Sequence, residues 1–512
     1  MIDTAALREK VLDLAIRGKL VPQDPTDEPA SVLLERIHEQ KLQMVREGKL
    51  KAKDVKDDTI IFKGDDNCYY EKFSDETIKN IQDEIPFDLP DGWSWSRLNS
   101  ISSSIQYGLN KSAEQIGTHK LLRITDIQDG FVDWNNVPYT TIDEYDKYQL
   151  RVNDIVFART GATVGKSYII KEVPFPTVYA SYLIRIRVFD SVCADYIYAF
   201  FNSGCYWGQI TDKSIGVGQP NCNGTSLSQL FIPIPPIAEQ LRVLDKAKES
   251  LTLVRSIEKS EKTINESKTL LKSKILELAI QGKLVPQDEN DEPASVLLER
   301  IRAERKAKLG KKYVESYIFK GDDNCYYEHI DGKAKDEAIE VPFDLPNNWA
   351  WVRWGDLSYS IQYGYNAPAK ERGRIKMVRI SDIHDNTVDW TNVPFCDIDE
   401  KDINTYLLKT NDILFARTGG TVGKSYLVTD VLEDAIYAGY LIRTRYSSEL
   451  TAQYLKYFME SSLYWEQLRE GTIATAQPNC NGQTLSKMLL PIPPLAEQKR
   501  IVDKINEIFA KL

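Results

Sequence analysis

The stretch NDIVFARTGATVGKSY at residues 153–168 occurs again as NDILFARTGGTVGKSY at residues 411–426, with two positions changed. Further matching stretches surround it. They are AIRGKLVPQD at 15–24 and AIQGKLVPQD at 279–288, KGDDNCYY at 63–70 and 320–327, QPNCNG at 219–224 and 477–482, and PIPPIAEQ at 233–240 and PIPPLAEQ at 491–498. The second half of the chain therefore repeats the first.

The repeat is far longer than the unit of a solenoid protein, because matching residues lie about 256 to 264 positions apart. Each copy is therefore expected to be a complete domain with a connector. Two such domains suggest pseudo-twofold symmetry. That symmetry suits a partner with two related halves, such as duplex DNA with its antiparallel strands.

A long helix is predicted between the two domains, over residues 237–281, which contain neither proline nor glycine. Apolar residues recur there every seven positions, at Ile237, Leu244 and Leu251 and again at Ile257, Ile264, Leu271 and Leu278. At 1.5 Å per residue such a helix is roughly 65 Å long. Its single narrow apolar seam requires a partner helix.

The partner helix is present in two pieces, at the two ends of the chain. Residues 496–512 match the start of the long helix at 238–254, and residues 1–18 match its end at 265–282. The ten positions 255–264 have no counterpart. We therefore expect the first and last helices to dock antiparallel onto the central helix and to make the chain quasi-cyclic.

The domains themselves are predicted to be α+β. Residues 155–158 and 182–187 are short, branched and aromatic, as in strands, whereas residues 196–201 indicate a helix. The expected order is an N-terminal helix that completes the second spacer helix (1–18), a helical or irregular connector (19–85), a first recognition domain (86–236), the central spacer helix (237–282), a second helical or irregular connector (283–341), a second recognition domain (342–494) and a C-terminal spacer helix (495–512).

The composition excludes several classes of protein. No run approaches the roughly 20 apolar residues of a membrane helix, and no secretory signal is evident, so a cytoplasmic location is expected. Seven cysteines without a Cys-x-x-Cys pair and four histidines give little basis for a structural metal site. A net charge of −10 argues against general coating of nucleic acid, so any DNA contact must be local.

Several motifs resemble catalytic ones but lack an essential feature. Residues 161–167, GATVGKS, place three residues before Gly-Lys-Ser where a P-loop needs four, so a turn that presents Arg159, Thr160 and Lys166 outward is expected instead. The Pro235-Pro236 pair has aliphatic neighbours, unlike the motif of amino-methyltransferases, and a Gly-x-Gly-x-x-Gly loop is missing. The available carboxylates, Asp126, Asp154, Asp382 and Asp412, form no recognisable nuclease site. We predict no catalytic residue, metal site or cofactor in this chain.

Three pairs of segments combine positive charge, amides suited to base edges and glycines that let a backbone approach DNA. They are 106–111 with 362–366, 159–166 with 417–424, and 219–224 with 477–482. The predicted DNA-binding residues in and beside them are Tyr107, Asn110, Lys111, Arg159, Thr160, Lys166, Gln219, Asn221, Tyr363, Asn366, Lys370, Arg417, Thr418, Lys424, Gln477 and Asn479.

Two further observations bear on these segments. Residues 151–187 carry six cations against two anions, namely Arg151, Arg159, Lys166, Lys171, Arg185 and Arg187 against Asp154 and Glu172. The segment 219–224 is unchanged in both copies, which also fits a structural turn. The stretches that diverge between the copies, 109–120 and 365–376, are better candidates for discriminating bases.

The duplicated domains, each followed by Pro-Ile-Pro-Pro-(Ile/Leu)-Ala-Glu-Gln and a long helix, closely resemble the specificity subunit of type I restriction-modification enzymes over nearly the whole chain. The resemblance implies that each domain reads one half of a bipartite DNA target and that the helices set the spacer. It implies partnership with two modification subunits, which use S-adenosylmethionine to methylate adenine, and with restriction subunits, which use ATP and Mg²⁺. The charged segments 31–49 and 295–309 are possible docking surfaces for those partners.

Two other functions stay open on sequence grounds. One is a stand-alone nuclease or methyltransferase whose motifs are not recognisable. The other is a duplicated protein-interaction scaffold without a role in DNA binding.

Overall fold

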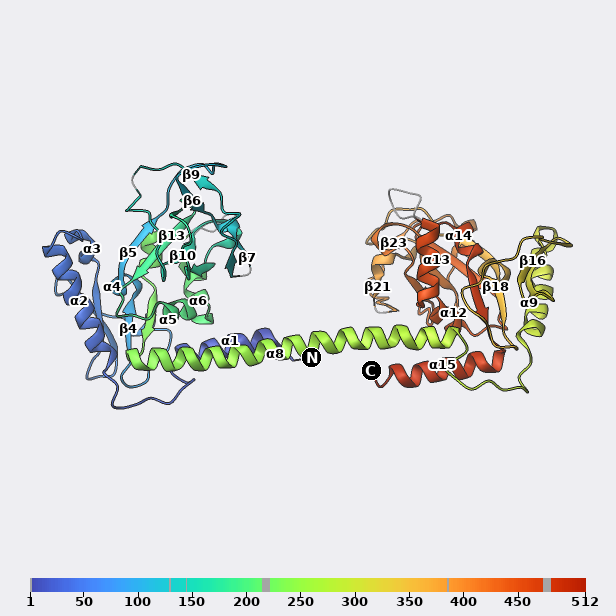
Figure 1. The fold of residues 1–512 in the computed structure, drawn as a ribbon, viewed down its shortest axis with the longest axis horizontal. Helices are drawn as coiled ribbons and strands as arrows, with labels where there is room; N and C mark the ends of the chain where they lie inside the picture. Colours follow the sequence, from blue (N-terminus) through green and yellow to red (C-terminus); the bar gives the residue numbers. More distant parts are fainter. Residues whose placement is uncertain (1, 129, 144, 214–221, 385, 473–479) are drawn as a thin grey trace. The chain divides into compact units, whose positions relative to one another are not determined.

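The computed structural model of the chain describes residues 2–512 except 129, 144, 214–221, 385 and 473–479, and no side chain at 53, 54, 162, 212, 213 or 472. It divides into two compact units, Met1–Lys262 and Thr263–Leu512. Each unit contains one copy of the repeat (Figure 1). The boundary falls inside α8, Ile237–Ile280, a helix of 44 residues that confirms the predicted one.

The first unit mixes short helices and strands before α8. Its elements are α1 (Thr4–Ile16), α2 (Ala30–Arg46), α3 (Ala52–Lys56), β1 (Thr59–Lys63), β2 (Tyr69–Phe73), β3 (Ile78–Asn80), η1 (Gln82–Glu84), β4 (Ser94–Arg97), α4 (Leu98–Ile101), β5 (Ser102–Tyr107), β6 (His119–Leu122), η2 (Ile124–Asp126), β7 (Ile127–Gln128), β8 (Phe131–Val132), β9 (Tyr139–Thr140), β10 (Ile155–Ala158), η3 (Gly161–Thr163), β11 (Ser167–Ile169), β12 (Thr177–Tyr179), β13 (Leu183–Val188), α5 (Ala194–Phe200), α6 (Gly204–Lys213), α7 (Gly224–Ser228) and β14 (Phe231–Ile234).

The second unit follows the same plan after α8. Its elements are α9 (Ala294–Leu309), η4 (Gly310–Lys312), β15 (Ser316–Lys320), β16 (Tyr326–Ile330), β17 (Lys333–Ala334), β18 (Ala350–Arg353), α10 (Trp354–Leu357), β19 (Ser358–Tyr363), β20 (Ile375–Val378), η5 (Ile380–Asp382), β21 (Ile383–His384), β22 (Thr387–Val388), β23 (Phe395–Cys396), α11 (Glu400–Tyr406), β24 (Ile413–Ala416), η6 (Gly419–Thr421), β25 (Ser425–Leu427), β26 (Ala435–Tyr437), β27 (Leu441–Tyr446), α12 (Ala452–Phe458), α13 (Ser462–Thr472), α14 (Gly482–Lys487), β28 (Leu489–Ile492) and α15 (Leu495–Phe509).

A four-stranded antiparallel sheet is the centre of each domain. Its order is β11-β10-β13-β5 in the first unit and β25-β24-β27-β19 in the second. All four residues of β10 are buried, because Ile155 and Phe157 pack into one hydrophobic cluster and Val156 and Ala158 pack into another. A strand buried on both faces has no polar alternation, which explains its continuous apolar sequence. The predicted α+β class is confirmed.

The connectors contain more structure than the sequence indicated. Residues 19–85 were expected to be helical or irregular, but they also include the three-stranded sheet β1-β2-β3. Ile61, Tyr69 and Ile81 of this region pack against Trp95 of β4. The short, partly exposed strands gave too weak a pattern to be recognised, and their stability comes from this packing.

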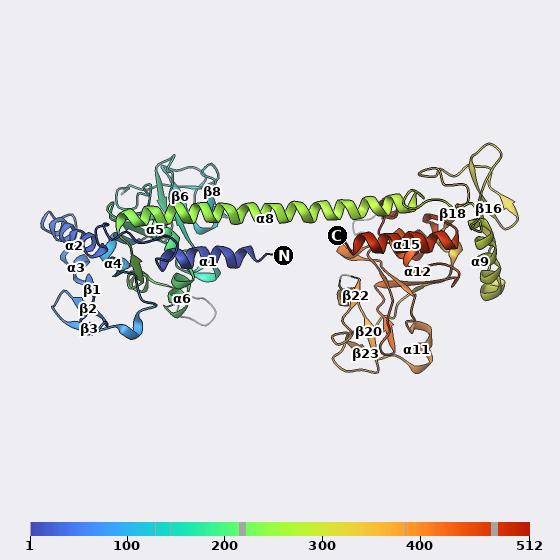
Figure 2. The same cartoon turned by 90° about the horizontal axis from the view of Figure 1, so that it is seen from below.

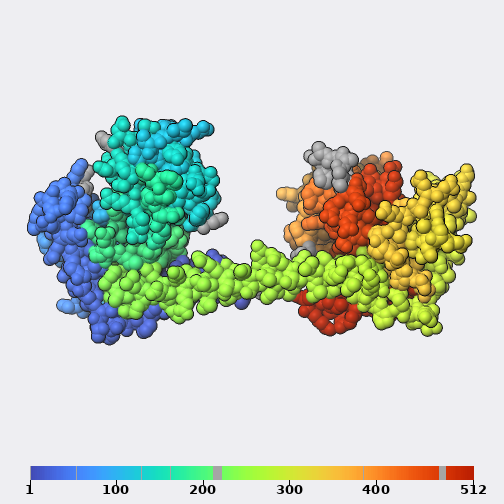
Figure 3. Space-filling view, viewed as in Figure 1, coloured from blue at the N-terminus to red at the C-terminus, as the bar shows by residue number. Residues whose placement is uncertain are grey.

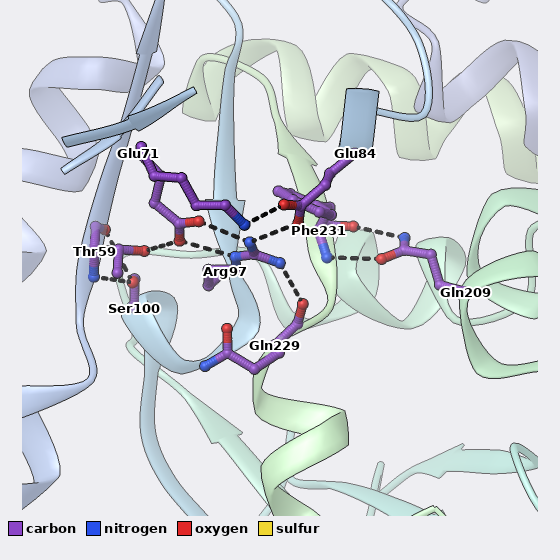
Figure 4. Close-up of polar contacts among 9 residues, drawn as sticks. Thr59, Glu71, Glu84, Arg97, Ser100, Gln209, Gln229 and Phe231 are labelled. Atoms are coloured by element: carbon purple, nitrogen blue, oxygen red, sulfur yellow. Dashed lines mark hydrogen bonds and ion pairs between the residues drawn. The ribbon is translucent and has the colours of Figure 1, made fainter. Parts of the chain in front are cut away.

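A buried ion pair joins this small sheet to the domain (Figure 4). The Arg97 guanidinium donates to both carboxylate oxygens of Glu71, at 2.9 and 2.7 Å. Glu71 also accepts from the Thr59 hydroxyl at 2.6 Å, and Arg97 donates to the Gln229 carbonyl at 2.8 Å. In the second unit, Arg353 and Glu328 form the same ion pair. Both connectors are thus anchored through one repeated charge pair.

The terminal helices dock on α8 as predicted, each within its own unit (Figure 2). In the first unit, the Ile2 backbone donates to Glu261 at 2.9 Å and Arg8 pairs with Glu258. In the second unit, the Lys272 ammonium lies 5.4 Å from the ring centre of Phe509. In the first unit the residue numbers of α1 and α8 run in opposite directions between these two contacts, so this pair is antiparallel.

The repeated Ala-Glu-Gln and Lys-Leu-Val-Pro-Gln-Asp motifs meet where each helix pair joins its domain. Glu239 of the Ala-Glu-Gln motif accepts from the Trp93 indole at 3.0 Å and from Gln23 at 3.1 Å. Glu497 of the second unit accepts from Trp349 at 2.8 Å and from Gln287 at 2.6 Å. The same residues occur in both copies because they attach the helices to each domain. Figure 3 shows α8 lying along one side of each unit.

The buried Asp356 of α10, which contacts α9 and β15, makes the stability of the second unit depend on pH. Burial raises the pKa of its carboxyl from 3.8 to about 6, although Arg305 lies 3.7 Å away and Ser316 donates to it at 3.2 Å. Because the pKa is raised on folding, ionisation costs stability as the pH rises from 3.8 through 6. Asp356→Asn removes this cost, so its stability relative to wild type should improve by up to about 3 kcal/mol between pH 3.5 and pH 8.

Urea unfolding of both proteins at several pH values measures this difference. Glu299→Gln, on the exposed side of α9, is the control and should show no such trend. A difference between Asp356→Asn and wild type that does not change with pH would contradict the assignment.

Candidate nucleic-acid interface

The predicted contact residues gather at one edge of the four-stranded sheet. In the first unit, Tyr107 ends β5, Arg159 follows β10, and Lys166 precedes β11. The strand register places Tyr107 opposite Ile184 and Ala158 opposite Leu183, so these ends lie side by side. The antiparallel order brings together segments that are far apart in sequence.

Arg159 is held against an aromatic ring at this edge. Its guanidinium carbon lies 4.9 Å from the ring centre of Tyr107, a cation–π arrangement. The Tyr107 hydroxyl accepts from the Gly224 backbone at 2.7 Å, and the Arg159 carbonyl accepts from Cys222 at 3.0 Å. Within the described part of the chain no carboxylate pairs with Arg159. The guanidinium is therefore positioned and its charge is not neutralised by a neighbour.

The second unit builds the same arrangement. Arg417 lies 4.8 Å from the ring centre of Tyr363, whose hydroxyl accepts from Gly482 at 3.1 Å. Cys480 donates to the Arg417 carbonyl at 3.0 Å. Tyr107 and Tyr363 are 40% and 42% exposed, so part of each side chain is accessible to a ligand.

A second tyrosine in each unit was missed by sequence analysis. Tyr182 and Tyr440 are 64% and 65% exposed, and their carbonyls accept from the Arg159 and Arg417 backbone at 3.1 Å. Tyr182 was assigned to a strand, but β13 begins one residue later. Its recurrence before a matching strand in both copies was the available signal. We call Tyr107, Arg159 and Tyr182, and equally Tyr363, Arg417 and Tyr440, the tyrosine–arginine cluster.

The GATVGKS segment is a turn, as predicted. It joins the antiparallel strands β10 and β11 through the short 3₁₀ helix η3, where a P-loop would lead into an α-helix. The Gly165 carbonyl accepts from the Tyr206 hydroxyl at 2.5 Å, and a Cβ at Gly165 would lie 2.5 Å from Trp207. Packing therefore explains this glycine. Lys166 and its counterpart Lys424 are exposed, whereas Thr160 and Thr418 are half-buried.

The structure gives the glycine of the Gln-Tyr-Gly segment a reason that the sequence did not indicate. It was expected to let the backbone approach DNA. A Cβ at Gly108 would lie 2.3 Å from the Ala180 carbonyl oxygen, and one at Gly364 would lie 2.2 Å from that of Ala438. Glycine is needed because two chain segments touch here. Asn110, Lys111, Asn366 and Lys370 lie exposed in the loops that follow, and Lys370 pairs with Asp397 at 2.6 Å.

Four predicted residues, Gln219, Asn221, Gln477 and Asn479, lie outside the described residues. The cysteine and asparagine that follow each of these segments stabilise the fold. Cys222 and Cys480 are buried. Asn223 caps α7 by accepting from Ser226 at 2.8 Å, and Asn481 caps α14 in the same way.

The local excess of positive charge in residues 151–187 was overestimated. Arg185 is buried, where burial lowers its pKa, and it donates to the carbonyl of Gln149 at 3.0 Å and to Gln106 at 2.9 Å. Arg187 pairs with Asp154 at 2.6 Å, and Lys171 pairs with Asp195. Arg185 and Arg187 are thus held inside the domain and Lys171 is paired at its surface, which leaves Arg151, Arg159 and Lys166.

The carboxylates that were considered for nuclease chemistry are also in internal pairs. Asp126 and Asp382 bind Arg123 and Arg379 at 2.6 and 2.7 Å, and Asp412 binds Arg445 at 2.7 Å. Among the described residues, no group of three or more His, Cys, Asp or Glu side chains could hold a metal ion. In the same part of the chain, no helix is long and apolar enough to cross a membrane.

Comparison with known proteins decides the family. The model of the type I restriction modification DNA specificity domain matches residues 90–266 and again residues 346–512. The chain belongs to this family. Like other type I specificity subunits it carries two repeated domains, and its function is recognition of a DNA sequence.

Curated relatives extend the match to almost the whole specificity subunit. The EcoAI specificity subunit of Escherichia coli is 25% identical, over 98% of this chain and 88% of its own length, and the EcoEI specificity subunit is 24% identical over the same shares. A solved structure described as the basis of complex assembly and conformational transition of the type I R-M system is similar in fold. Its TM-score is 0.54 and its identity 17%, over 83% of this chain and 92% of that one.

Proposed function

We propose that this specificity subunit is a non-catalytic reader in which each domain recognises one half of a bipartite DNA target through its tyrosine–arginine cluster. The proposal rests on the fact that the chain builds the same cluster twice at the same sheet edge, with exposed tyrosines around a half-buried arginine. Arginine is suited to guanine edges and to phosphates, and tyrosine rings offer stacking surfaces. The loops 109–120 and 365–376, which follow Tyr107 and Tyr363 and differ between copies, are proposed to discriminate bases.

Affinity is proposed to depend on an assembled complex. The chain has a net charge of −10, whereas a protein that binds DNA alone at physiological salt usually relies on many phosphate contacts. This subunit would then contribute selectivity, and two modification subunits and the restriction subunits would contribute affinity and chemistry. S-adenosylmethionine, ATP and Mg²⁺ are assigned to those partners. The helix pairs are proposed to set the length of the unspecific spacer.

Binding-site selection tests the proposal with the subunit assembled with its modification partner. The expected result is a split motif with two short specific halves. Because the two domains are so alike, the half-sites should be related but not identical, in inverted orientation. Selection of two unrelated half-sites would refute the role of the repeated cluster, and absence of any preference would refute sequence reading.

A further inference from the structure

A cavity of about 300 Å³ lies in the first unit, between α2, β1 and β4. Its volume is at the lower end of the range of small-molecule sites, about 300–1,000 Å³. Its walls combine apolar and polar side chains, including Leu34, Glu35, His38, Ile60, Trp95 and Ser96. It lies where the connector packs on the domain, and it shares no lining residue with the tyrosine–arginine cluster.

The second unit has the corresponding place almost filled. A cavity of about 20 Å³ is lined there by Leu298, Arg302, Ser316, Tyr317, Ile318, Trp351, Val352 and Asp356. In the repeat alignment each of these residues corresponds to one that lines the larger cavity, as Leu298 does to Leu34 and Trp351 to Trp95. The same site is therefore open in one copy and closed in the other.

The difference comes from a few side chains. Tyr317 stands where the first copy has Ile60, and Arg302 stands where it has His38. The Arg302 guanidinium lies 5.0 Å from the Tyr317 ring centre, and the His329 ring stacks on the same tyrosine ring, with 4.5 Å between the ring centres. Val352 and Asp356 also replace the smaller Ser96 and Ser100. In the second unit, the site therefore holds an aromatic ring with a cation beside it, and both belong to the chain's own side chains.

We propose that the open cavity of the first unit binds a small aromatic molecule that carries an ammonium group. The ring would take the place that Tyr317 occupies in the second unit. The charge would lie near Glu35 and Glu39 of α2, which line the cavity and pair with no lysine or arginine in the described part of the chain. Ile60 and Phe62, 46% and 39% exposed, would provide apolar contact.

Fluorine NMR with 4-fluorophenethylamine as the probe tests the proposal on the full-length subunit. We expect wild type to bind the probe with a Kd of about 1 mM or tighter, as for a fragment-sized ligand. 4-Fluorophenylacetate has the same ring and the opposite charge, and it should bind at least about tenfold more weakly, since the acidic wall disfavours an anion.

Exchanging the two copies' residues provides matched variants. Ile60→Tyr with His38→Arg should close the first cavity and weaken binding at least about tenfold, since the site is then occupied by the chain itself. Tyr317→Ile with Arg302→His should open a second site and add one equivalent of bound probe. Thermal unfolding shows whether each variant is folded. The proposal is overturned if wild type does not bind the amine at about 10 mM, if both charges bind equally, or if a folded closed variant binds as wild type does.

Discussion

Arg159→Ala is expected to weaken specific DNA binding of the assembled complex by about 5- to 150-fold, equivalent to about 1–3 kcal/mol for one base-reading contact. The reason is that Arg159 is held by Tyr107 with no acidic partner among the described residues, so its charge is available to DNA. The loss should affect only the half-site that the first domain reads. Arg417→Ala should affect the other half-site in the same way. Competition binding with targets mutated in one half at a time measures both effects.

Two further variants separate the possible roles of Arg159. Arg159→Lys keeps the charge but not the bidentate geometry, so it should restore binding to phosphates without restoring base preference. Lys79→Ala, at an exposed lysine of the connector that pairs with Glu84, is the control and should bind as wild type does. If Arg159→Ala is folded and binds every target with wild-type affinity and preference, the cluster is not the reading site.

Glu71→Ala is expected to have the largest effect on stability, a loss of about 3–5 kcal/mol in the free energy of unfolding of the first unit. Glu71 and Arg97 are both buried, with side chains 2% and 7% exposed. Removing the carboxylate leaves the Arg97 charge in the interior without its main partner. Burial acts to raise the pKa of Glu71, but hydrogen bonds from Arg97 and Thr59 outweigh it and lower the pKa. The stabilisation is therefore present at neutral pH and is lost as the pH falls below about 4.5.

Hydrogen–deuterium exchange during urea unfolding measures this loss on peptides that cover β2 and β4. Glu28→Ala breaks an exposed pair with Arg36 and should cost no more than about 1 kcal/mol. Equal effects of the two substitutions would show that the buried pair does not anchor the connector.

Features with a strong local or repeated pattern could be predicted from the sequence. The helix α8 begins at the predicted residue and ends within two residues of the predicted end, because proline, glycine and apolar spacing mark it locally. The strand at Ile155–Ala158 and the docking of both terminal helices were also predicted. The repeat itself made those docking predictions possible, since the terminal segments match the two halves of α8.

Features that depend on contacts distant in sequence could not be predicted. Arg185 and Arg187 counted as available cations in the sequence, and only their positions beside Gln106 and Asp154 show that they are internal. The same applies to Gly108, whose close neighbour is Ala180. Tyr182 lies beside Arg159 through a backbone hydrogen bond across the sheet edge, which the sequence does not show. The strands of the connector sheet are too short to be recognised individually.

The most direct test of sequence reading by this subunit is methylome sequencing of a host that expresses it with its modification subunit, compared with the same host lacking this chain. The account predicts methyladenine at a split motif that disappears when the chain is removed. Unchanged methylation, with both subunits shown to be expressed and assembled, would contradict it.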